Sequence, residues 1–252
     1  MSSSGLTGRT ALVTGSTSGL GAGIAVALAR AGALVVVTGR TRTRGEKIVK
    51  QIESDGGRAV FVPVDFSAGP EAVNELAAAA TDAAGGRLDI LVNNVATLVQ
   101  PAPTAEVSAE EITAAFGVSV ITPFLLTGLI APSMAQRGDG AIVNIGSIAG
   151  VNGAAGSALY GATKAGVHML TKAWAAEYGP SGVRVNAVAP GPIATERNEE
   201  FAHGIAPILE RIPSHRMSTV GEVAGVVTFL AGPDAGNVHG AIWAVDGGTT
   251  AI

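Results

Sequence analysis

The apolar positions of the chain form short continuous runs that alternate with amphipathic segments. The runs predict buried strands, and the segments between them have the helical period of about 3.6 residues. Strands that are apolar on both sides are typical of a parallel sheet covered by helices on both faces. Strands are expected over residues 10–14, 34–38, 59–65, 88–93, 141–145, 183–189 and 241–246, and helices over 24–31, 42–54, 70–84, 108–135, 157–178 and 219–230.

Regular alternation of strands and helices predicts an α/β fold with a doubly wound parallel sheet of about seven strands. No linker, repeat or break in composition divides the chain, so a single domain over residues 1–252 is expected. Residues 191–217 contain Pro192, Pro207 and Pro213 and are expected to be irregular or weakly helical.

The composition narrows the possible partners. Hydrophobic residues make up 47% of the 252 residues and charged residues 14%. The mean hydropathy of +0.40 suggests that other subunits cover part of the helix surface. A net charge of −4 gives no reason to expect nucleic acid or an anionic membrane as a partner. The absence of cysteine excludes disulfides, thiol catalysis and thiolate metal sites, and no metal is expected.

Two segments bear on location. The N-terminus lacks the apolar core of a signal peptide. The apolar run over 118–134 is interrupted by threonine, proline and glycine, whereas a membrane-spanning helix needs about 20 mostly apolar residues. We therefore expect a buried helix here, no membrane contact, and a cytoplasmic protein by default.

A glycine-rich turn follows the first strand and opens the first helix. Glycines there let the backbone approach a pyrophosphate, which the helix N-terminus attracts. The spacing alone is equally compatible with a tight turn, but its place between strand and helix favours a dinucleotide site. The predicted binding residues of this turn are Gly15, Ser16, Thr17, Ser18, Gly19, Leu20 and Gly21.

The end of the second strand indicates which dinucleotide binds. An acidic residue there would favour NAD(H), but the strand is followed by Arg40, and the first acid is Glu46. A guanidinium suits a 2′-phosphate, so NADP(H) is favoured and NAD(H) is the alternative. Arg42 and Arg44 are also compatible with a solvated helix start. At the ends of the next two strands, Asp65, with Phe66 after it, is either an adenine contact or a cap, and Asn93 supports the sheet or lines the cofactor site.

Three candidate catalytic side chains lie along residues 144–164. Ser147 follows the fifth strand, and Tyr160 and Lys164 are four residues apart, on one face of a helix. At about 4 Å and an effective dielectric near 20, a protonated lysine would lower the tyrosine pKa by roughly three units. Tyr160 would then exchange a proton with a carbonyl or alcohol oxygen, with Ser147 orienting that oxygen and Lys164 also holding the nicotinamide ribose.

Together these motifs resemble the short-chain dehydrogenase/reductase family over essentially the whole length. The matching pieces include residues 14–21, Asp65, 93–96, Ser147, 160–164, Asn186, 190–191 and 246–248. The resemblance implies a Rossmann fold, NAD(P)(H), Ser–Tyr–Lys catalysis, and homodimers or homotetramers built through two long helices and the last strand. It also implies a substrate lid over about 191–217 and cofactor contacts from Pro190, Gly191, Ile193 and Thr195.

Two positions depart from the family pattern. Val95 and Ala96 stand where the family usually has alanine and glycine, which adds bulk beside the cofactor. Ser119 occupies the place of an asparagine that the family uses in a proton relay to the lysine. A serine can hold a water with shorter reach, so Ser119 is included among the catalytic residues, in a modified relay.

The expected substrate is a small-molecule ketone or secondary alcohol, because the residues expected to line the pocket are mainly small and apolar. They are Thr97, Leu98, Val99, Ile148, Asn152, Ala154, Pro192 and Ile193, with Arg197, His203, Arg211 and His215 in the lid. The expected activity is an NADP(H)-dependent carbonyl reductase or alcohol dehydrogenase. The alternatives are an NAD-dependent dehydrogenase of a hydroxylated metabolite, a 3-oxoacyl-carrier reductase, and a cofactor-binding regulator with weakened catalysis.

Overall fold

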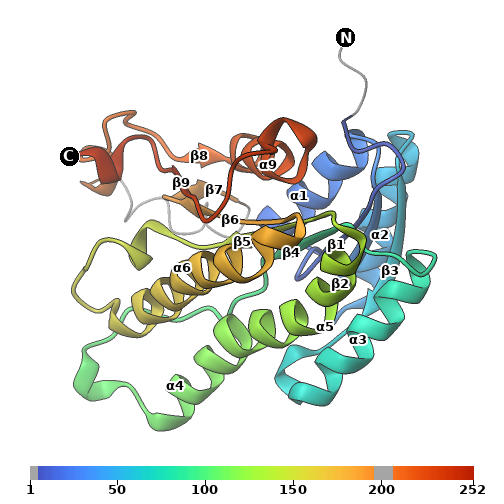
Figure 1. Ribbon diagram of the computed structural model, residues 1–252. Helices are drawn as coiled ribbons and strands as arrows, with labels where there is room; N and C mark the ends of the chain where they lie inside the picture. Colours follow the sequence, from blue (N-terminus) through green and yellow to red (C-terminus); the bar gives the residue numbers. More distant parts are fainter. Residues whose placement is uncertain (1–4, 196–206) are drawn as a thin grey trace.

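The computed structural model describes residues 5–195 and 207–252. At its centre lies a parallel sheet of seven strands in the order β3-β2-β1-β4-β5-β6-β9 (Figure 1). This order confirms the predicted doubly wound sheet. The strands are β1 (Thr10–Val13), β2 (Leu34–Gly39), β3 (Arg58–Pro63), β4 (Ile90–Asn93), β5 (Gly140–Ile145), β6 (Val183–Pro190) and β9 (Ile242–Val245).

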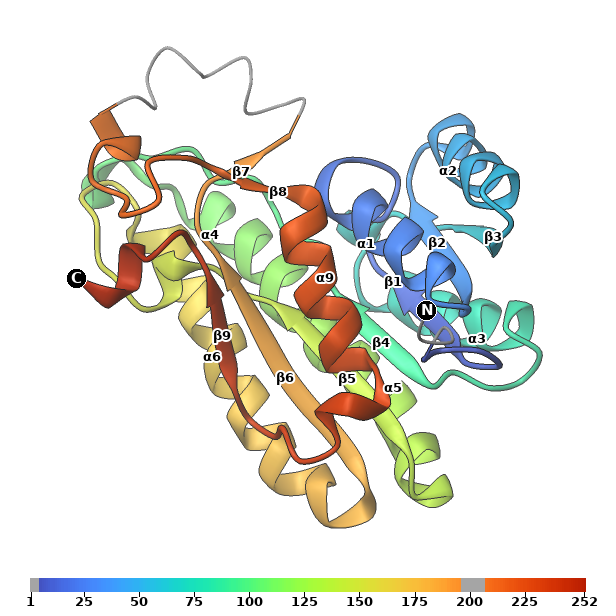
Figure 2. The ribbon, with the colours of Figure 1, turned by 90° about the horizontal axis from the view of Figure 1, so that it is seen from above.

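Helices cover both faces of the sheet (Figure 2). On one face lie α1 (Gly19–Arg30), α2 (Arg42–Ser54) and α9 (Val220–Ala231), and on the other lie α3 (Pro70–Ala83), α5 (Thr122–Arg137) and α6 (Ala158–Tyr178). Successive strand residues belong to different apolar layers: Val35 and Val37 pack on the first face and Val36 on the second. This is the alternation that a strand buried on both faces requires.

The long helix expected over 108–135 is divided in two. Ser108 and Glu111 form the expected capping box at the start of α4 (Ala109–Phe116). A π-helical turn, η3 (Gly117–Ile121), then separates α4 from α5, and the Thr122 hydroxyl donates to the Gly117 carbonyl at 3.2 Å. Such turns are rare and are frequently found at functional sites. The extra residue leaves the apolar pattern almost unchanged, which is why the pattern predicts one helix.

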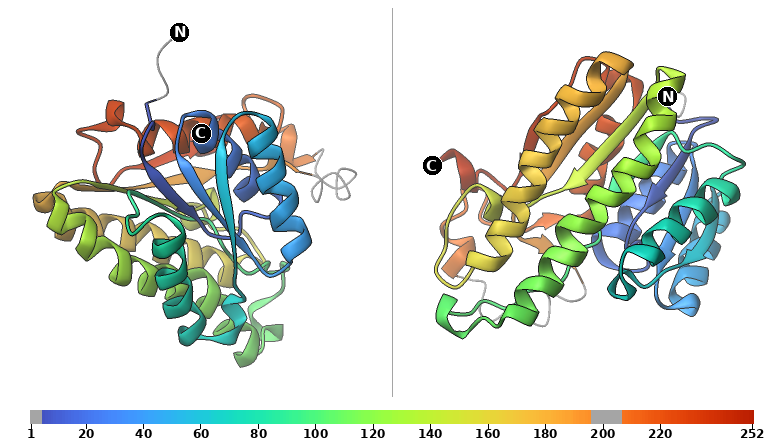
Figure 3. Two further views of the ribbon diagram at one scale, coloured as in Figure 1. Left: turned by 90° about the vertical axis from the view of Figure 1, so that its right-hand side faces the viewer. Right: turned by 60° about the horizontal axis from the view of Figure 1, so that its bottom comes forward.

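The stretch Ala109–Arg137 is long and apolar enough, by length and composition, to cross a membrane. In the fold, however, Leu126, Ile130 and Met134 are buried in the apolar layer between α5 and the sheet. Helices α5 and α6 lie side by side (Figure 3), and the rings of Phe124 and Trp174 are 5.9 Å apart. The segment therefore buries one side against the sheet, as a core helix does, whereas Ile121, Phe124 and Leu129 on its other side are exposed.

The described part of the region after β6 is irregular with a short helical stretch at 207–209, as expected, and a short parallel strand pair was not predicted. Strand β7 (Ile193–Ala194) pairs with β8 (Ser218–Thr219), directly before α9. Short 3₁₀ turns complete the described chain: η1 (Phe66–Ala68), η2 (Thr104–Glu106), η4 (Ile148–Gly150), η5 (Gly179–Ser181), η6 (Pro233–Ala235) and η7 (Thr249–Ala251).

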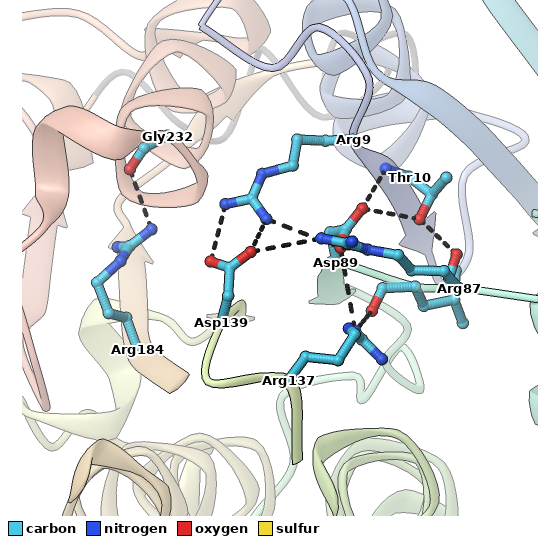
Figure 4. Close-up of polar contacts among 9 residues, drawn as sticks. Arg9, Thr10, Arg87, Asp89, Arg137, Asp139, Arg184 and Gly232 are labelled. Atoms are coloured by element: carbon cyan, nitrogen blue, oxygen red, sulfur yellow. Dashed lines mark hydrogen bonds and ion pairs between the residues drawn. The ribbon is translucent and has the colours of Figure 1, made fainter. Parts of the chain in front are cut away.

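An ionic cluster closes the amino-terminal edge of the sheet (Figure 4). Asp89, whose side chain is fully buried, accepts from the Thr10 N–H at 3.0 Å and from the Arg87 guanidinium. Asp139 accepts two hydrogen bonds from Arg9, whose guanidinium also lies 3.7 Å from Asp89. The cluster joins the segments that precede β1, β4 and β5. Ligand sites in such sheets lie at the opposite edge, where the strands have their carboxyl ends.

Candidate active site

The glycine loop has the shape that a dinucleotide needs. Gly15 and Gly19 have φ angles of +65° and +53°, which favour glycine. A Cβ at Gly21 would lie 2.3 Å from the Gly15 carbonyl oxygen, so no side chain fits there. Ser18, the N-cap of α1, makes no side-chain capping bond, and the first turn of this fully described helix has no acidic residue. Its N–H groups therefore suit a pyrophosphate.

Residues at the end of β4 hold this loop in place. The Asn94 amide donates to the Thr14 carbonyl at 2.8 Å and to the Gly15 carbonyl at 3.2 Å. The Thr14 hydroxyl accepts from the backbone N–H groups of Asn94 and Val95 at 2.9 and 3.0 Å. The loop is thus tied to the strand beside it at the point where the strand order reverses, the usual ligand crevice of such sheets.

Gly21→Ala is expected to destabilise the protein by about 1–3 kcal/mol, because the new methyl group would overlap loop atoms. It should also weaken NADPH binding, measured by the fluorescence of the bound cofactor. Gly225→Ala in α9 is the matched control, since a Cβ there meets nothing within 4 Å. Unfolding and binding curves that are the same for Gly21→Ala as for the wild type would contradict this view of the loop.

The side chains of some predicted cofactor residues are engaged inside the fold. The buried Ser16 hydroxyl donates to the Val13 carbonyl at 2.7 Å and accepts from the Thr38 N–H at 2.9 Å. Phe66 packs in the apolar core. The Asn93 amide donates to Asn144 at 2.9 Å inside the sheet, as sheet support requires. Any contact of these three residues with a dinucleotide would come from backbone atoms.

Arg40 and Asp65 lie at the ends of neighbouring strands. Arg40 is exposed directly after β2. Asp65 caps η1 by accepting from the Ser67 N–H at 3.0 Å and from the Ser67 hydroxyl at 2.7 Å. These bonds, with a smaller contribution from the Arg40 charge, hold the pKa of Asp65 below its ordinary value. The capping interpretation of Asp65 is confirmed, and its adenine contact stays a prediction.

A cavity of about 1110 Å³ runs from the glycine loop along α1, α2 and α9. Thr17, Ser18 and Thr195 line it together, so the structure brings the residue after β7 to the loop. Gly191 packs closely on the Asp246 backbone, where an added Cβ would lie 2.9 Å from its Cα. Ser147 and Tyr160 do not line this cavity, whose lining extends along α1 and α2 as far as Arg30 and Gln51.

The three candidate catalytic residues meet beyond the end of β5. Ser147 is buried and caps η4, its hydroxyl accepting from the Ala149 N–H at 3.2 Å. Tyr160, in the first turn of α6, is hydrogen-bonded to Ser147. Lys164 is only 4% exposed, and its ammonium donates to the Ile145 carbonyl at 2.8 Å.

The electrostatics of Tyr160 differ from the sequence-based expectation. Burial raises the pKa of the Tyr160 phenol above its ordinary value, and the hydrogen bond with Ser147 only partly offsets this. The predicted lowering by Lys164 is wrong for this structure, because the ammonium is bonded to Ile145 and lies 5.8 Å from the Tyr160 ring centroid. Burial also lowers the pKa of Lys164 to about 8. A phenol that remains protonated is suited to donate a proton to a carbonyl oxygen.

Comparison with known proteins agrees with this geometry. A family model described as "Enoyl-(Acyl carrier protein) reductase" matches residues 15–250. The chain belongs to the short-chain dehydrogenase/reductase family. It is 38% identical to a 3-oxoacyl-[acyl-carrier-protein] reductase of Synechocystis sp. over 245 residues, covering 96% of this chain and 97% of that one.

Two sugar-acid dehydrogenases are equally similar. The 2-dehydro-3-deoxy-D-gluconate 5-dehydrogenase of Bacillus subtilis is 37% identical over 253 residues, covering 96% of this chain and 95% of its own. A crystal structure of a putative 2-deoxy-D-gluconate 3-dehydrogenase from Agrobacterium tumefaciens, with bound NADP, has a TM-score of 0.91 at 38% identity and covers all of both chains. The predicted family, single Rossmann domain and short-chain dehydrogenase/reductase oxidoreductase are thereby confirmed.

The buried lysine of this short-chain dehydrogenase/reductase makes stability depend on pH. The folded pKa of about 8 lies below the ordinary 10.5, so the unfolded chain binds more protons between these values. The contribution of Lys164 to stability therefore increases as pH rises from 8 to 10.5, by about 3 kcal/mol. Urea unfolding of the wild type and of Lys164→Met, each at pH 8 and at pH 10.5, measures this contribution. The free energy of unfolding should rise more with pH in the wild type than in Lys164→Met. Lys172→Met, which changes an exposed neighbouring lysine, is the control and should behave as the wild type does. Parallel pH dependences of wild type and Lys164→Met would contradict it.

Two further buried residues, Ser119 and His168, belong to the candidate site of this short-chain dehydrogenase/reductase. Ser119 lies buried in the π-helical turn, and its hydroxyl accepts from the Thr97 N–H at 3.1 Å. Its part in a proton relay stays a prediction. His168 was not predicted as a site residue, yet it is buried one helical turn beyond Lys164, and the positive charge of that lysine contributes to lowering the His168 pKa. The i, i+4 spacing that links Tyr160 to Lys164 also links Lys164 to His168.

Proposed function

We propose that this short-chain dehydrogenase/reductase is an NADP(H)-dependent carbonyl reductase or alcohol dehydrogenase that interconverts a ketone and a secondary alcohol. The observation that carries the proposal is the meeting of Ser147, Tyr160 and Lys164 at the same sheet edge as the glycine loop. The bound dinucleotide supplies or accepts the hydride. The protein supplies position and a proton.

Each side chain has one task in this reaction. Tyr160 donates its phenolic proton to the carbonyl oxygen during reduction and takes it back during oxidation. Ser147 donates a hydrogen bond to the same oxygen and fixes its orientation. The Lys164 ammonium, held by the Ile145 carbonyl, is placed to hold the ribose hydroxyls of the dinucleotide. We assign to Ser119, in the π-helical turn, the relay that exchanges this proton with solvent.

The preference for NADP(H) rests on Arg40. Its exposed guanidinium follows β2, and Arg44 and Lys47 line the nearby cavity, whose described lining contains no acidic residue. A 2′-phosphate would therefore meet positive charge.

Arg40→Ala is expected to raise the Kd for NADPH by about 10- to 100-fold and to leave the Kd for NADH nearly unchanged. Arg42→Ala is the matched control, because Arg42 lies 3.6 Å from the Glu46 carboxylate on the outside of α2. Titration of each variant with both cofactors measures the effect. An equal loss for both cofactors would assign Arg40 to loop structure instead.

The function itself is tested with a panel of ketones, secondary alcohols and one 3-oxoacyl thioester, each with NADPH and NADH. Ketone reduction with NADPH supports the proposal, and faster turnover with NADH supports an NAD-dependent dehydrogenase. Thioester reduction alone would indicate the carrier-linked activity. That activity ranks lower because the helix pair offers little exposed positive charge: Arg137 is bonded to the Leu88 carbonyl, and Lys172 remains. Tight cofactor binding without any turnover would indicate a regulator.

Assembly and location complete the proposal. The residues exposed on α4, η3, α5 and α6 include Ile112, Ile121, Phe124, Leu129 and Met169, which form an apolar face suited to a homodimer or homotetramer. Trp243, stacked on Phe229 at 5.3 Å, adds apolar surface at the β9 edge. Two of the relatives are named for small sugar acids, and we propose a small-molecule substrate and a cytoplasmic location for this chain. The lid proposed over about 191–217 includes residues 196–206, with Arg197 and His203, which lie outside the described residues.

A further inference from the structure

Three residues on successive turns of α6 face the end of β5. Tyr160 and Lys164 have been described, and His168 follows at the same spacing. His168 is 5% exposed and fills the space beneath the turn that carries Ser147. A Cβ at Gly146 would lie 2.1 Å from the His168 Nε2, and one at Gly150 would lie 2.8 Å from its Cε1. The imidazole thus touches the turn on both sides of Ser147.

The hydrogen bonds of His168 define its tautomer. A hydrogen bond with the Gly150 backbone raises its pKa, as donation to the carbonyl does. Among the described residues, Nε2 has no hydrogen-bond partner. We therefore assign the donated proton to Nδ1, which leaves the imidazole neutral with no proton on Nε2.

The surroundings disfavour a charged imidazole. Burial and the positive charges of Lys164 and Lys172 lower the pKa of His168 below 6.5. The adjoining β5 and η4 carry no ionisable side chain. The other charged groups of α6 and of the elements packed against it contribute nothing that offsets the lysines: Glu110, Glu111, Arg137, Glu177 and Arg184. Within residues 5–195 and 207–252, no carboxylate balances a cation at this place.

We propose that His168 is a positioning residue that holds the Ser147 turn through the neutral Nδ1–H tautomer. It acts from beneath, through the Gly150 carbonyl and the contact with Gly146, so that the Ser147 hydroxyl stays on Tyr160. Protonation would place a third positive charge beside Lys164 and Lys172 and displace the turn. This inference rests on the proposed function, because positioning has meaning only for an active Ser–Tyr–Lys site.

Two substitutions separate the hydrogen bond from packing. His168→Leu keeps most of the volume and loses the donor, whereas His168→Asn keeps a donor at the δ position and loses volume. We expect His168→Leu to lower kcat for ketone reduction by about 10- to 100-fold, with the Kd for NADPH nearly unchanged. His168→Asn should restore much of kcat, although it is the less stable protein in urea. If His168→Leu, the more stable variant, also had the higher kcat of the two, the proposal would be overturned.

The pH profile and the NMR spectrum give further readouts. The wild-type kcat should fall on the acid side as His168 is protonated, and this limb should disappear in His168→Asn but persist in His239→Gln, an exposed control. Long-range ¹H–¹⁵N spectra of the resting wild type should show a His168 ring protonated at Nδ1 alone. A ring protonated at Nε2, or an acid limb unchanged in His168→Asn, would overturn the proposal. A wild type that reduces no ketone, whatever its His168 tautomer, would overturn the proposed function instead.

Discussion

Tyr160→Phe is expected to lower kcat for ketone reduction by about 10²- to 10⁴-fold, the range for loss of a general acid. The phenyl ring keeps the packing of Tyr160 but has no proton to give to the carbonyl oxygen. The Kd for NADPH should change by less than about twofold, because the glycine loop and Arg40 are untouched. Steady-state kinetics with the best ketone of the panel and a fluorescence titration measure the two quantities.

Tyr178→Phe is the natural control. The chain has two tyrosines, and Tyr178 ends the same helix that Tyr160 begins, far from Ser147. Its pKa is raised by burial and by Glu177, so its hydroxyl is also protonated at neutral pH. Tyr178→Phe should keep nearly all of the wild-type activity. A Tyr160→Phe enzyme that retained more than about a tenth of kcat would remove Tyr160 from the role of proton donor.

Asp89→Ala should cause a large loss of stability, about 2–4 kcal/mol, because it removes the buried carboxylate of the ionic cluster and leaves a buried backbone N–H without its acceptor. The buried Thr10 N–H would lose its acceptor, and the guanidiniums of Arg9 and Arg87 would lose a carboxylate that lies at 0% exposure between them. Urea unfolding at a fixed protein concentration measures the change. The fixed concentration matters because an oligomer's stability depends on it.

Two variants sharpen this measurement. Asp89→Asn keeps an acceptor for the Thr10 N–H and should fall between wild type and Asp89→Ala. Asp55→Ala removes a surface pair with Arg30, whose atoms are 2.8 Å apart, and should cost less than about 1 kcal/mol. Similar losses for Asp55→Ala and Asp89→Ala would mean that the buried cluster contributes no more than a surface pair.

The sequence is sufficient for those features in which neighbours along the chain are neighbours in space. Apolar runs identify the strands, and glycines between a strand and a helix identify the cofactor loop. The Tyr160–Lys164 pair follows from helical spacing alone. At these places the local sequence pattern and the residue chemistry indicate the same structure, so tertiary packing does not alter the predicted element or spacing.

Features made by packing escape such reasoning. The direction of the Tyr160 pKa depends on burial and on the Ile145 carbonyl that engages Lys164, neither of which a spacing reveals. His168 matters because Gly146 lies over it, and Asp89 because strand order brings it to Arg9, 80 positions earlier in the chain. The π-helical turn adds one residue between α4 and α5, and the apolar pattern of the sequence hardly changes, so the pattern alone does not reveal it.

The position of β9 has a consequence for biosynthesis. Its residues pair with β6 over Ala187 to Pro190, yet they are made last of all the sheet strands. Until Ile242–Val245 leave the ribosome, the edge of β6 has unpaired backbone groups, and such an open edge invites pairing with other chains. A nascent chain of this protein therefore remains vulnerable to aggregation until β9 has been made and has paired with β6, and chaperone binding to the unfinished sheet would protect it during that interval.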